Sequence, residues 1–400
     1  MVKQNGFNKI MNIVVIGTGM YSTGRGTSSY GTILPAIIEW ERDNNNLGKT
    51  FFVGTNGNNS RDLRIKSDNL IADTGVEIDI LFFPKDGIKD SSAYKKAISE
   101  IPKPACAIIV VPDHLHFQVA KDCLNAGLPF LIVKPLTPGL KEAKKLVDLA
   151  EERSLYSAVE FHKRYDKANL IIKDKFQSGK LGELLYCCVE YSQRKSIPTD
   201  IFKEWVEKTS VLQYLGVHYI DIIRFVTKAT PIRVMAIGQK NWLLSKGLDV
   251  FDSIQCFIEW ECTNGNLFTQ AILTNWIDPE STSAMSDQKI KLVGTNGRLE
   301  SDQKERGIKI VTDAYGNEEP NPDFCYEFGH NSGNKVWRGY GIDSVKKFLD
   351  DIVNINSGLI TAKSLQSDRP TLTEALISTA VIEAAHKSLA DNNNWVNVFD

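Results

Sequence analysis

The 400-residue chain lacks a surplus of basic residues, since 47 lysines and arginines face 49 aspartates and glutamates for a net charge of −2. No block is dense in Lys and Arg, which argues against binding to a nucleic-acid backbone. No apolar run approaches the about 20 residues that span a bilayer, and the first ten residues lack the apolar core of a secretory signal. We therefore expect a cytoplasmic protein that binds neither nucleic acid nor membrane.

Cysteine is scarce and scattered, with seven residues that lie mostly inside apolar runs. An odd number without regular spacing is typical of small buried side chains rather than of a disulfide framework. The sequence contains no CxxC or HxxxH pattern, and His114 with His116 alone makes a poor ligand set. We expect no metal site.

The first part of the chain alternates short apolar runs with helical patterns. The runs are rich in β-branched residues and typical of strands buried on both faces of a parallel sheet. They lie at Asn12–Ile16, Thr50–Gly54, Ile78–Phe83, Ile108–Val111, Phe130–Val133 and Tyr156–Glu160. We expect a parallel α/β domain over residues 1–160.

From Leu184 the strands become longer and alternate between apolar and polar residues. Residues 252–261 and 267–274 flank a Thr-Asn-Gly-Asn turn and read as a hairpin. Gln288–Val293 and Gly307–Thr312 are expected to continue the same antiparallel sheet, with helices at 203–209, 210–227, 340–354 and 371–390. The prediction for residues 161–400 is an α+β domain whose open sheet face serves as an oligomer interface.

Gly17-Thr18-Gly19 directly follows the first strand. Glycines between a strand and a helix permit a tight turn and the close approach of a pyrophosphate. The third glycine of GxGxxG is Ser22, so either Ser22 substitutes for it or about ten residues are inserted and Gly31 resumes the motif. We favour the insertion because Gly31 immediately precedes a helical run. Arg25, inside this segment, either meets a phosphate or is solvated.

The second strand ends in Thr55-Asn56, where a dinucleotide-binding domain usually places an acid for the adenosine ribose. No acid occurs before Asp62, whereas Arg61 supplies a cation. These residues suit a 2′-phosphate and favour NADP over NAD, unless the segment is only a turn.

Two residues are candidates for chemistry. Lys134 follows the strand Phe130–Val133, and ligands of open parallel sheets gather beyond the carboxyl ends of the strands. His218 lies with Asp221 in an apolar helical stretch. Taken alone, such a lysine is more often a solvated charge and such a histidine a core residue.

Several motifs in order resemble the glucose–fructose oxidoreductase and inositol dehydrogenase (Gfo/Idh/MocA) family. They are GTG at 17–19, VVPDHLHFQVAKDCLNAGLPFLIVKP at 110–135, RYD at 164–166, GKLGEL at 179–184, GVHYID at 216–221, KLVGTNGRLESD at 291–302 and RPTLTEALISTAVIEAAHKS at 369–388. The resemblance implies an N-terminal Rossmann domain, a C-terminal domain with a large open sheet, and a nicotinamide cofactor. It further implies hydride transfer to or from a sugar, cyclitol or sugar nucleotide, in a homodimer or homotetramer.

The resemblance also assigns roles to residues. Lys134 would orient the reacting hydroxyl, and His218 would act as general base. Pro112 and His116 would lie in the cofactor-proximal loop, where Asp113 stands for the usual asparagine. Arg164 and Tyr165 would contact substrate. These assignments hold by position in the family motifs.

Two positions depart from the family pattern. Val133 replaces the glutamate before the lysine, and Tyr214 replaces the aspartate one helical turn before the histidine. Either Tyr214 relays protons or contacts substrate, or Asp221 or Asp166 orients the imidazole, or the chemistry is altered. The interpretation that we prefer is that the protein is an NAD(P)-dependent dehydrogenase. A cofactor-assisted glycosidase and a non-catalytic NAD(P)-sensing protein are the alternatives.

Overall fold

The computed structural model describes residues 10–329 and 334–399 and divides into two compact units. The first unit consists of Met1–Val133, Lys144–His162 and Asp323–Glu374; the second consists of Lys134–Ala143, Lys163–Pro322 and Ala375–Asp400. Each unit is thus built from several stretches of chain, whereas the sequence prediction divided the chain once, after residue 160.

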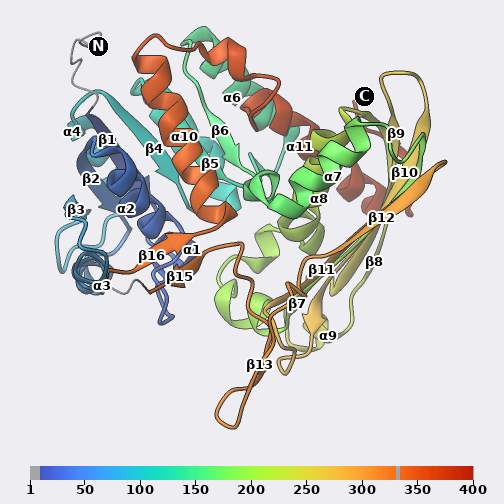
Figure 1. Cartoon of the computed structure of the whole chain (residues 1–400), viewed down its shortest axis with the longest axis horizontal. Coiled ribbons are helices and arrows are strands. Elements are labelled where there is room, and N and C mark those ends of the chain that lie inside the picture. Colours follow the sequence, from blue (N-terminus) through green and yellow to red (C-terminus); the bar gives the residue numbers. More distant parts are fainter. Residues whose placement is uncertain (1–9, 330–333, 400) are drawn as a thin grey trace. The chain divides into compact units, whose positions relative to one another are not determined.

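The first unit is built on a six-stranded parallel sheet with the strand order β3-β2-β1-β4-β5-β6 (Figure 1). The strands are β1 (Met11–Ile16), β2 (Leu47–Val53), β3 (Asp79–Phe83), β4 (Ala105–Ile109), β5 (Phe130–Val133) and β6 (Ala158–Glu160). The central strands β1 and β4 are buried along their whole length, as expected for strands covered on both faces. The predicted parallel domain is confirmed.

Helices and one small hairpin complete this unit. They are α1 (Met20–Thr23), α2 (Ile33–Asn44), α3 (Asn58–Thr74), α4 (Ala93–Glu100), α5 (His116–Asn125), α6 (Leu140–Glu152), α10 (Tyr340–Asn356) and the 3₁₀ turn Ala362–Leu365, with the hairpin strands β15 (Tyr326–Phe328) and β16 (Val336–Arg338). Helix α2 buries every residue from Ile33 to Trp40. Burial of each large apolar side chain contributes about 1.5–3 kcal/mol, and Trp40 Nε1 also donates to Asp350 Oδ1 of α10 at 2.8 Å.

The second unit contains a seven-stranded sheet with the order β12-β11-β7-β10-β9-β8-β17. Its strands are β7 (Leu184–Arg194), β8 (Thr230–Gln239), β9 (Ser253–Glu261), β10 (Leu267–Asp278), β11 (Ser286–Gly294), β12 (Gly297–Asp302) and β17 (Val396–Asn397). All neighbours are antiparallel except β7 and β10, so the prediction of a mainly antiparallel sheet is confirmed. The β9–β10 turn has Gly265 at φ +85°, the left-handed region that glycine adopts without strain.

The helical segments of the second unit are short apart from three. They are the 3₁₀ turn η2 (His162–Tyr165), α7 (Lys167–Gln177), the π turn η3 (Ile197–Ile201), the 3₁₀ turn η4 (Val206–Lys208), the π turn η5 (Leu212–Gly216), α8 (Val217–Thr227), α9 (Trp242–Ser245) and α11 (Leu372–Ala390). The helix predicted at 203–209 contains only η4, and the one at 210–227 is a π turn that continues into an α-helix. Within residues 10–329 and 334–399, we find no helix with the length and apolarity that crossing a membrane requires.

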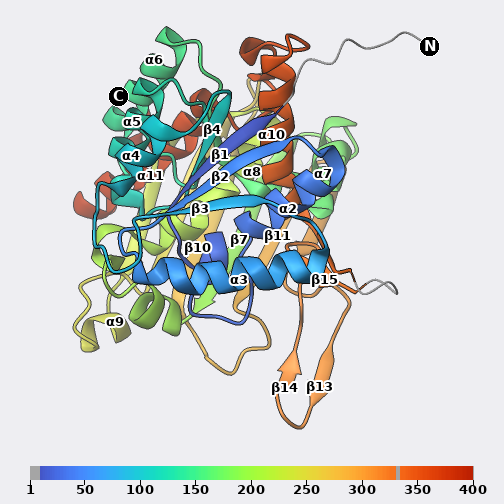
Figure 2. The same cartoon turned by 90° about the vertical axis from the view of Figure 1, so that its left-hand side faces the viewer.

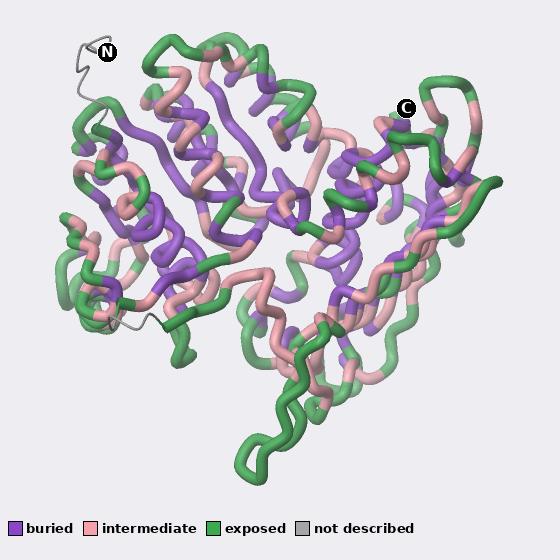
Figure 3. Tube along the Cα trace, viewed as in Figure 1, coloured by how far each residue is buried: buried purple, intermediate pink, exposed green. Residues whose placement is uncertain are grey.

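The strand expected at Gly307–Thr312 lies elsewhere than predicted. Ile310–Thr312 (β13) pairs only with Gly316–Glu318 (β14), in a separate two-stranded hairpin that projects from the rest of the second unit (Figure 2). Every residue from 307 to 318 is exposed, and Figure 3 shows the arm in green against the purple core. The prediction that this segment continues the large sheet is therefore wrong, because strand propensity does not specify a pairing partner.

Candidate functional site

The glycine turn after β1 requires glycine at its first position. Gly17 has φ +113°, and a Cβ added there would lie 1.9 Å from the carbonyl oxygen of Val110. A Cβ on Gly19 would meet no atom within 4 Å. The backbone at Gly19 is thus open for the close approach of a pyrophosphate, and this arrangement fits a dinucleotide cofactor.

The helix that follows is interrupted after one turn. Helix α1 begins at Met20, directly behind Gly19, and ends at Gly24 in the left-handed conformation. The chain then leaves the helix and resumes it in α2, after Gly31 at φ +72°. Ser22 lies buried in the single turn directly behind Gly19, and Gly31 lies just before α2, so the insertion that we favour stays a prediction.

Thr55, Asn56 and Arg61 lie together beyond the end of β2. The Thr55 carbonyl accepts a hydrogen bond from Asp90 N at 2.9 Å, and Asn56 Oδ1 accepts one from Asn58 N at 3.1 Å. Arg61 is exposed in the first turn of α3 and lines a surface pocket together with Asn58, Asp62, Asp86 and Gly87. The pocket offers one guanidinium and two carboxylates.

Pro112 and His116 flank a 3₁₀ turn, Asp113–Leu115, beyond the end of β4. The imidazole of His116 is fully buried, and its Nε2 lies 2.9 Å from the carbonyl oxygen of Val111. His116 therefore fixes the course of the chain just before Pro112. Its direct contact with a cofactor stays a prediction.

The ammonium of Lys134 is held by Tyr214. Lys134 Nζ donates a hydrogen bond to the carbonyl oxygen of Tyr214 at 2.6 Å and lies 3.3 Å from the centre of the Tyr214 ring. The ammonium thus contacts the negative end of a carbonyl dipole and the negative face of an aromatic ring. Tyr214, predicted to relay protons or to contact substrate, thus contacts Lys134, and the catalytic role of Lys134 stays a prediction.

His218 follows Tyr214 by one turn. Tyr214 lies in the π turn η5, and His218 lies in α8, where its side chain is buried. π turns are rare and occur frequently at functional sites. The structure thus brings Lys134 to the same helical segment that carries the predicted base.

Three aromatic side chains surround the ring of Tyr214. Its centre lies 4.6 Å from that of Phe202, 6.2 Å from that of Trp276 and 6.4 Å from that of Trp205. Phe202 and Trp276 are buried, whereas Trp205 is half-buried. The ring that supports the ammonium is thus fixed by close packing.

The two carboxylates proposed as alternative partners of His218 are both bound by arginines. Arg164 donates from Nε and Nη2 to Asp221 at 2.8 and 2.6 Å, and all of these atoms belong to buried residues. Asp166 caps α7 by accepting from Ala168 N at 3.0 Å, and it accepts from Arg306 Nη2 at 2.6 Å. The contact of Arg164 with substrate stays a prediction, as does that of the neighbouring Tyr165.

Lys163 is a buried lysine that was not among the site residues predicted from the sequence. Burial lowers the pKa of Lys163 to about 7, against the opposing influence of Asp166. Its Nζ donates to Gln288 and lies 5.5 and 5.4 Å from the ring centres of Tyr191 and Tyr219. Its neighbours come from β7, α8 and β11, which lie far along the chain, so no local pattern signals them.

A second missed cluster lies in the first unit. Glu160 accepts from Ser344 Oγ at 2.7 Å and lies 2.9 Å from Nδ1 of His162. The His162 ring is stacked with those of Tyr21 and Tyr340, at centre distances of 6.3 and 5.6 Å. Burial, followed by the charge of Glu160, raises the pKa of Tyr21 well above its usual value. An acid at the end of a buried strand is the signal that points to this cluster.

Two models of a single enzyme family match the chain. Residues 70–161 match the oxidoreductase family with an NAD-binding Rossmann fold, and residues 170–300 match the GFO/IDH/MocA C-terminal domain. The two matches together cover more than half of the chain. The chain belongs to the Gfo/Idh/MocA family.

Relatives and solved structures agree with this family. An uncharacterized oxidoreductase of Schizosaccharomyces pombe is 27% identical over 52% of this chain and 57% of its own length. The NADP⁺-dependent scyllo-inositol 2-dehydrogenase of Bacillus subtilis is 28% identical over 31% of this chain and 35% of its own. The matched part of the chain thus spans about a third of the length of one relative and somewhat more than half of the length of the other.

The fold extends over nearly the whole chain. The crystal structure of scyllo-inositol dehydrogenase from Lactobacillus casei, with bound NAD(H) and scyllo-inositol, superposes with a TM-score of 0.68. The superposition covers 98% of this chain and 100% of that one, at 14% sequence identity. The predicted Rossmann domain and C-terminal sheet domain of the Gfo/Idh/MocA family are therefore confirmed.

In the part of the chain that the structure describes, no group of three or more His, Cys, Asp or Glu side chains is placed to hold a metal ion. The seven cysteines are free thiols, and four of them are buried.

Substitutions at Tyr214 test how Lys134 is held. Tyr214→Phe keeps the ring and the backbone carbonyl, so we expect kcat/KM within about 3-fold of the original. Tyr214→Leu removes the ring face, and loss of a desolvated cation–π contact of about 1–2 kcal/mol predicts a decrease of about ten-fold. Steady-state kinetics checks both values. An equal loss in the two variants would instead assign the role to the phenolic hydroxyl, as in a proton relay.

Proposed function

We propose that the protein is an NAD(P)-dependent oxidoreductase that transfers a hydride between nicotinamide and a hydroxyl-bearing carbon of a sugar, cyclitol or sugar nucleotide. The observation that carries the proposal is the Lys134 ammonium, bound by the carbonyl and ring of Tyr214 one turn before His218. Oxidation of an alcohol needs a fixed cation for the developing alkoxide and a base for the hydroxyl proton.

The cofactor supplies the hydride acceptor when it is bound. Gly17, Gly19, Pro112 and the residues after β2 would hold it. Lys134 Nζ donates one hydrogen bond to the carbonyl oxygen of Tyr214. In the proposed reaction Lys134 donates to the substrate oxygen and stabilises the developing alkoxide, while His218 accepts the hydroxyl proton. The proton leaves the oxygen and the hydride leaves the adjacent carbon.

Arg164 and Tyr165 complete the proposed substrate site. The ion pair with Asp221 fixes the guanidinium of Arg164 in one orientation. A bidentate pair of this kind positions donors rigidly. We therefore assign Arg164 a positioning role for the neighbouring Tyr165 and for the substrate.

A panel of substrates tests the reaction class. The purified protein is mixed with NAD⁺ or NADP⁺ and with sugars, inositols and sugar nucleotides, and the absorbance of reduced nicotinamide is followed. Net reduction with at least one polyol supports the proposal. Cleavage of glycosides without net reduction would replace it by a glycosidase, and tight cofactor binding without any turnover would replace it by a sensor.

Arg61 tests the preference for NADP. We propose that its guanidinium meets the 2′-phosphate, because no acid occurs between the end of β2 and Asp62 and because Arg61 is exposed at the pocket that it lines together with Asp62 and Asp86. Arg61→Ala should weaken binding of NADPH about ten-fold or more, the loss expected for a charge-assisted hydrogen bond. NADH binding should change less than 2-fold. Equal losses for the two cofactors, measured by fluorescence titration, would refute the preference.

We propose a homodimer or homotetramer that forms through the large sheet. Along β9 the buried side chains of Ile254, Cys256, Ile258 and Trp260 alternate with half-buried ones. Leu267 is exposed on β10, which pairs with β9, and Leu185 and Tyr186 are exposed on β7, the strand beyond β10. Sedimentation equilibrium should give a multiple of the 44.7 kDa chain mass. A monomer at micromolar concentration would contradict this assembly, and Leu185→Lys should weaken it.

A further inference from the structure

A lysine of α3 binds three carbonyl groups of the segment inserted after the glycine turn. Lys66 Nζ donates to the carbonyl oxygens of Gly24 at 2.6 Å, Thr27 at 2.8 Å and Ser29 at 2.5 Å. All three donors of the ammonium are thus used on one loop, residues 24–31, which we call the inserted loop. Charge-assisted hydrogen bonds of this kind are the strong ones.

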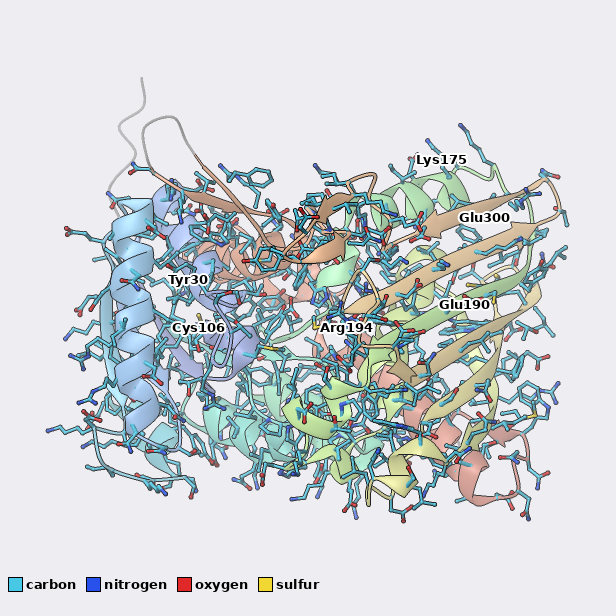
Figure 4. The ribbon with its side chains drawn as sticks, turned by 90° about the horizontal axis from the view of Figure 1, so that it is seen from below. Tyr30, Cys106, Lys175, Glu190, Arg194 and Glu300 are labelled. Carbon is cyan, nitrogen blue, oxygen red and sulfur yellow. The ribbon has the colours of Figure 1, made fainter. Side chains whose placement is uncertain are left out.

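The inserted loop has a second attachment to the same face of α3. Tyr30, labelled in Figure 4, donates from its hydroxyl to Asp73 Oδ2 at 3.3 Å. Asp73 follows Lys66 by seven residues, or two helical turns, so both side chains lie on one face. The Tyr30 ring also packs edge-on against Trp337 at 5.7 Å. The loop is therefore fixed at its start, in its middle and at its end.

The base of the inserted loop is closed onto the glycine turn. Thr32 N donates to the carbonyl oxygen of Tyr21 at 2.7 Å. A Cβ on Gly31 would lie 2.7 Å from that same oxygen and from Thr23 N, and a Cβ on Gly24 would lie 1.9 Å from the Ser29 carbonyl. The position of the loop and that of the single helical turn behind Gly19 therefore depend on each other.

The inserted loop itself carries one charged side chain, and that charge is positive. Arg25 is exposed in the inserted loop and is the only charged residue between Gly17 and Thr32. Burial lowers the pKa of Lys66, and the charge of Asp62 opposes that shift. The carbonyls turn toward Lys66, so their negative ends point to α3.

We propose that the inserted loop is a second phosphate-binding element of the cofactor site, with Arg25 as its cation and Lys66 as the positioning residue that holds the loop in place. This rests on the proposed use of a nicotinamide dinucleotide. A loop that is already ordered loses little conformational entropy when the cofactor binds, so the affinity for the cofactor is higher. The pyrophosphate is common to NAD and NADP, so the effect of Lys66 is the same for both.

Variants at Lys66 and Arg25 test the inference in the full-length protein. Lys66→Met keeps the length of the side chain and removes its donors, and Arg25→Gln removes the guanidinium. Each should raise the dissociation constants of both NAD⁺ and NADP⁺ about ten-fold, the loss of one charge-assisted contact. The KM for cofactor should rise equally, while kcat at saturating cofactor stays within about 2-fold. Lys66→Arg, which keeps a donor, should recover most of the affinity.

A double variant separates this role from a structural one. If Lys66 acts through Arg25, the two substitutions remove the same interaction. The dissociation constant of the double variant should then lie within about 2-fold of that of the weaker-binding single variant. Lys145→Met, which removes an exposed lysine from α6, is the matched control and should leave affinity unchanged.

Three results would overturn the inference. They are unchanged cofactor affinity in Lys66→Met, additive losses in the double variant, and a fall in kcat that matches the rise in KM. If Lys66→Met does not fold, Arg25→Gln alone decides, and unchanged binding then refutes the proposal. Absence of binding of either dinucleotide to the unaltered protein would instead refute the proposed function itself.

Discussion

Replacing Lys134 by alanine is expected to lower kcat by roughly 10²–10⁴-fold, the range for a positioned group that acts on a reacting proton or charge. The reason is that the ammonium stands over the Tyr214 ring and donates to its carbonyl, so its place is set before substrate arrives. The cofactor dissociation constant should change little, because the lysine acts on the substrate oxygen. Steady-state kinetics and a cofactor titration measure the two quantities.

A matched control for this variant is Lys246→Ala. Lys246 also lies over an aromatic ring in the second unit, 5.4 Å from the centre of Trp242, and it is exposed. Its loss removes the same charge and a similar contact, so activity should be retained. Near-normal turnover in Lys134→Ala would refute the role of Lys134 in stabilising the developing alkoxide.

Replacing His218 by alanine should also reduce kcat by roughly 10²–10⁴-fold, because the hydroxyl proton loses its acceptor. His218 is buried in α8, so the variant leaves a cavity next to the site. Added imidazole should enter that cavity and restore part of the activity in a concentration-dependent way. Circular dichroism and cofactor affinity should be close to those of the unaltered protein.

Rescue by imidazole is the informative readout for His218. A residue needed only for packing would lower the free energy of unfolding without any response to a soluble base. Activity within a few-fold of the original in His218→Ala would refute its role as base. If His218→Ala does not fold, His218→Gln replaces it as the test. Glutamine keeps most of the side-chain volume and removes the basic nitrogen, so this variant should be equally inactive.

Local patterns were sufficient to predict the first sheet. The runs at Asn12–Ile16 and Phe130–Val133 lie on β1 and β5, because continuous β-branched apolar residues suit strands buried on both faces. The β9–β10 hairpin was predictable for a similar reason, since the Asn-Gly turn and the period of two coincide. By contrast, Ile310–Thr312 has the composition of a strand and pairs only within an exposed hairpin.

The contacts of the candidate site were less predictable than its residues. Lys134 and His218 stood out through motif order, whereas the contact between Lys134 and Tyr214 joins residues 80 positions apart. The same holds for Lys66, whose acceptors lie 37 to 42 residues earlier in the chain. Such pairs depend on tertiary packing, which hydrophobic periodicity does not encode.

The surroundings of Lys134 differ from those that the family pattern implies. The resemblance implied carboxylates before Lys134 and before His218, and here those positions are Val133 and Tyr214. A carbonyl dipole and an aromatic face now hold the ammonium. Neither of these two partners carries a formal charge, and a fixed ammonium can stabilise an alkoxide that develops beside it.

The most direct test of hydride transfer is a single turnover with a substrate from the panel that carries deuterium on its reacting carbon. The reduced nicotinamide is then isolated and examined by mass spectrometry. The account predicts one deuterium on the nicotinamide ring of each reduced cofactor and a ketone in the product. Deuterium found in the solvent, or retained on the substrate carbon after turnover, would contradict it.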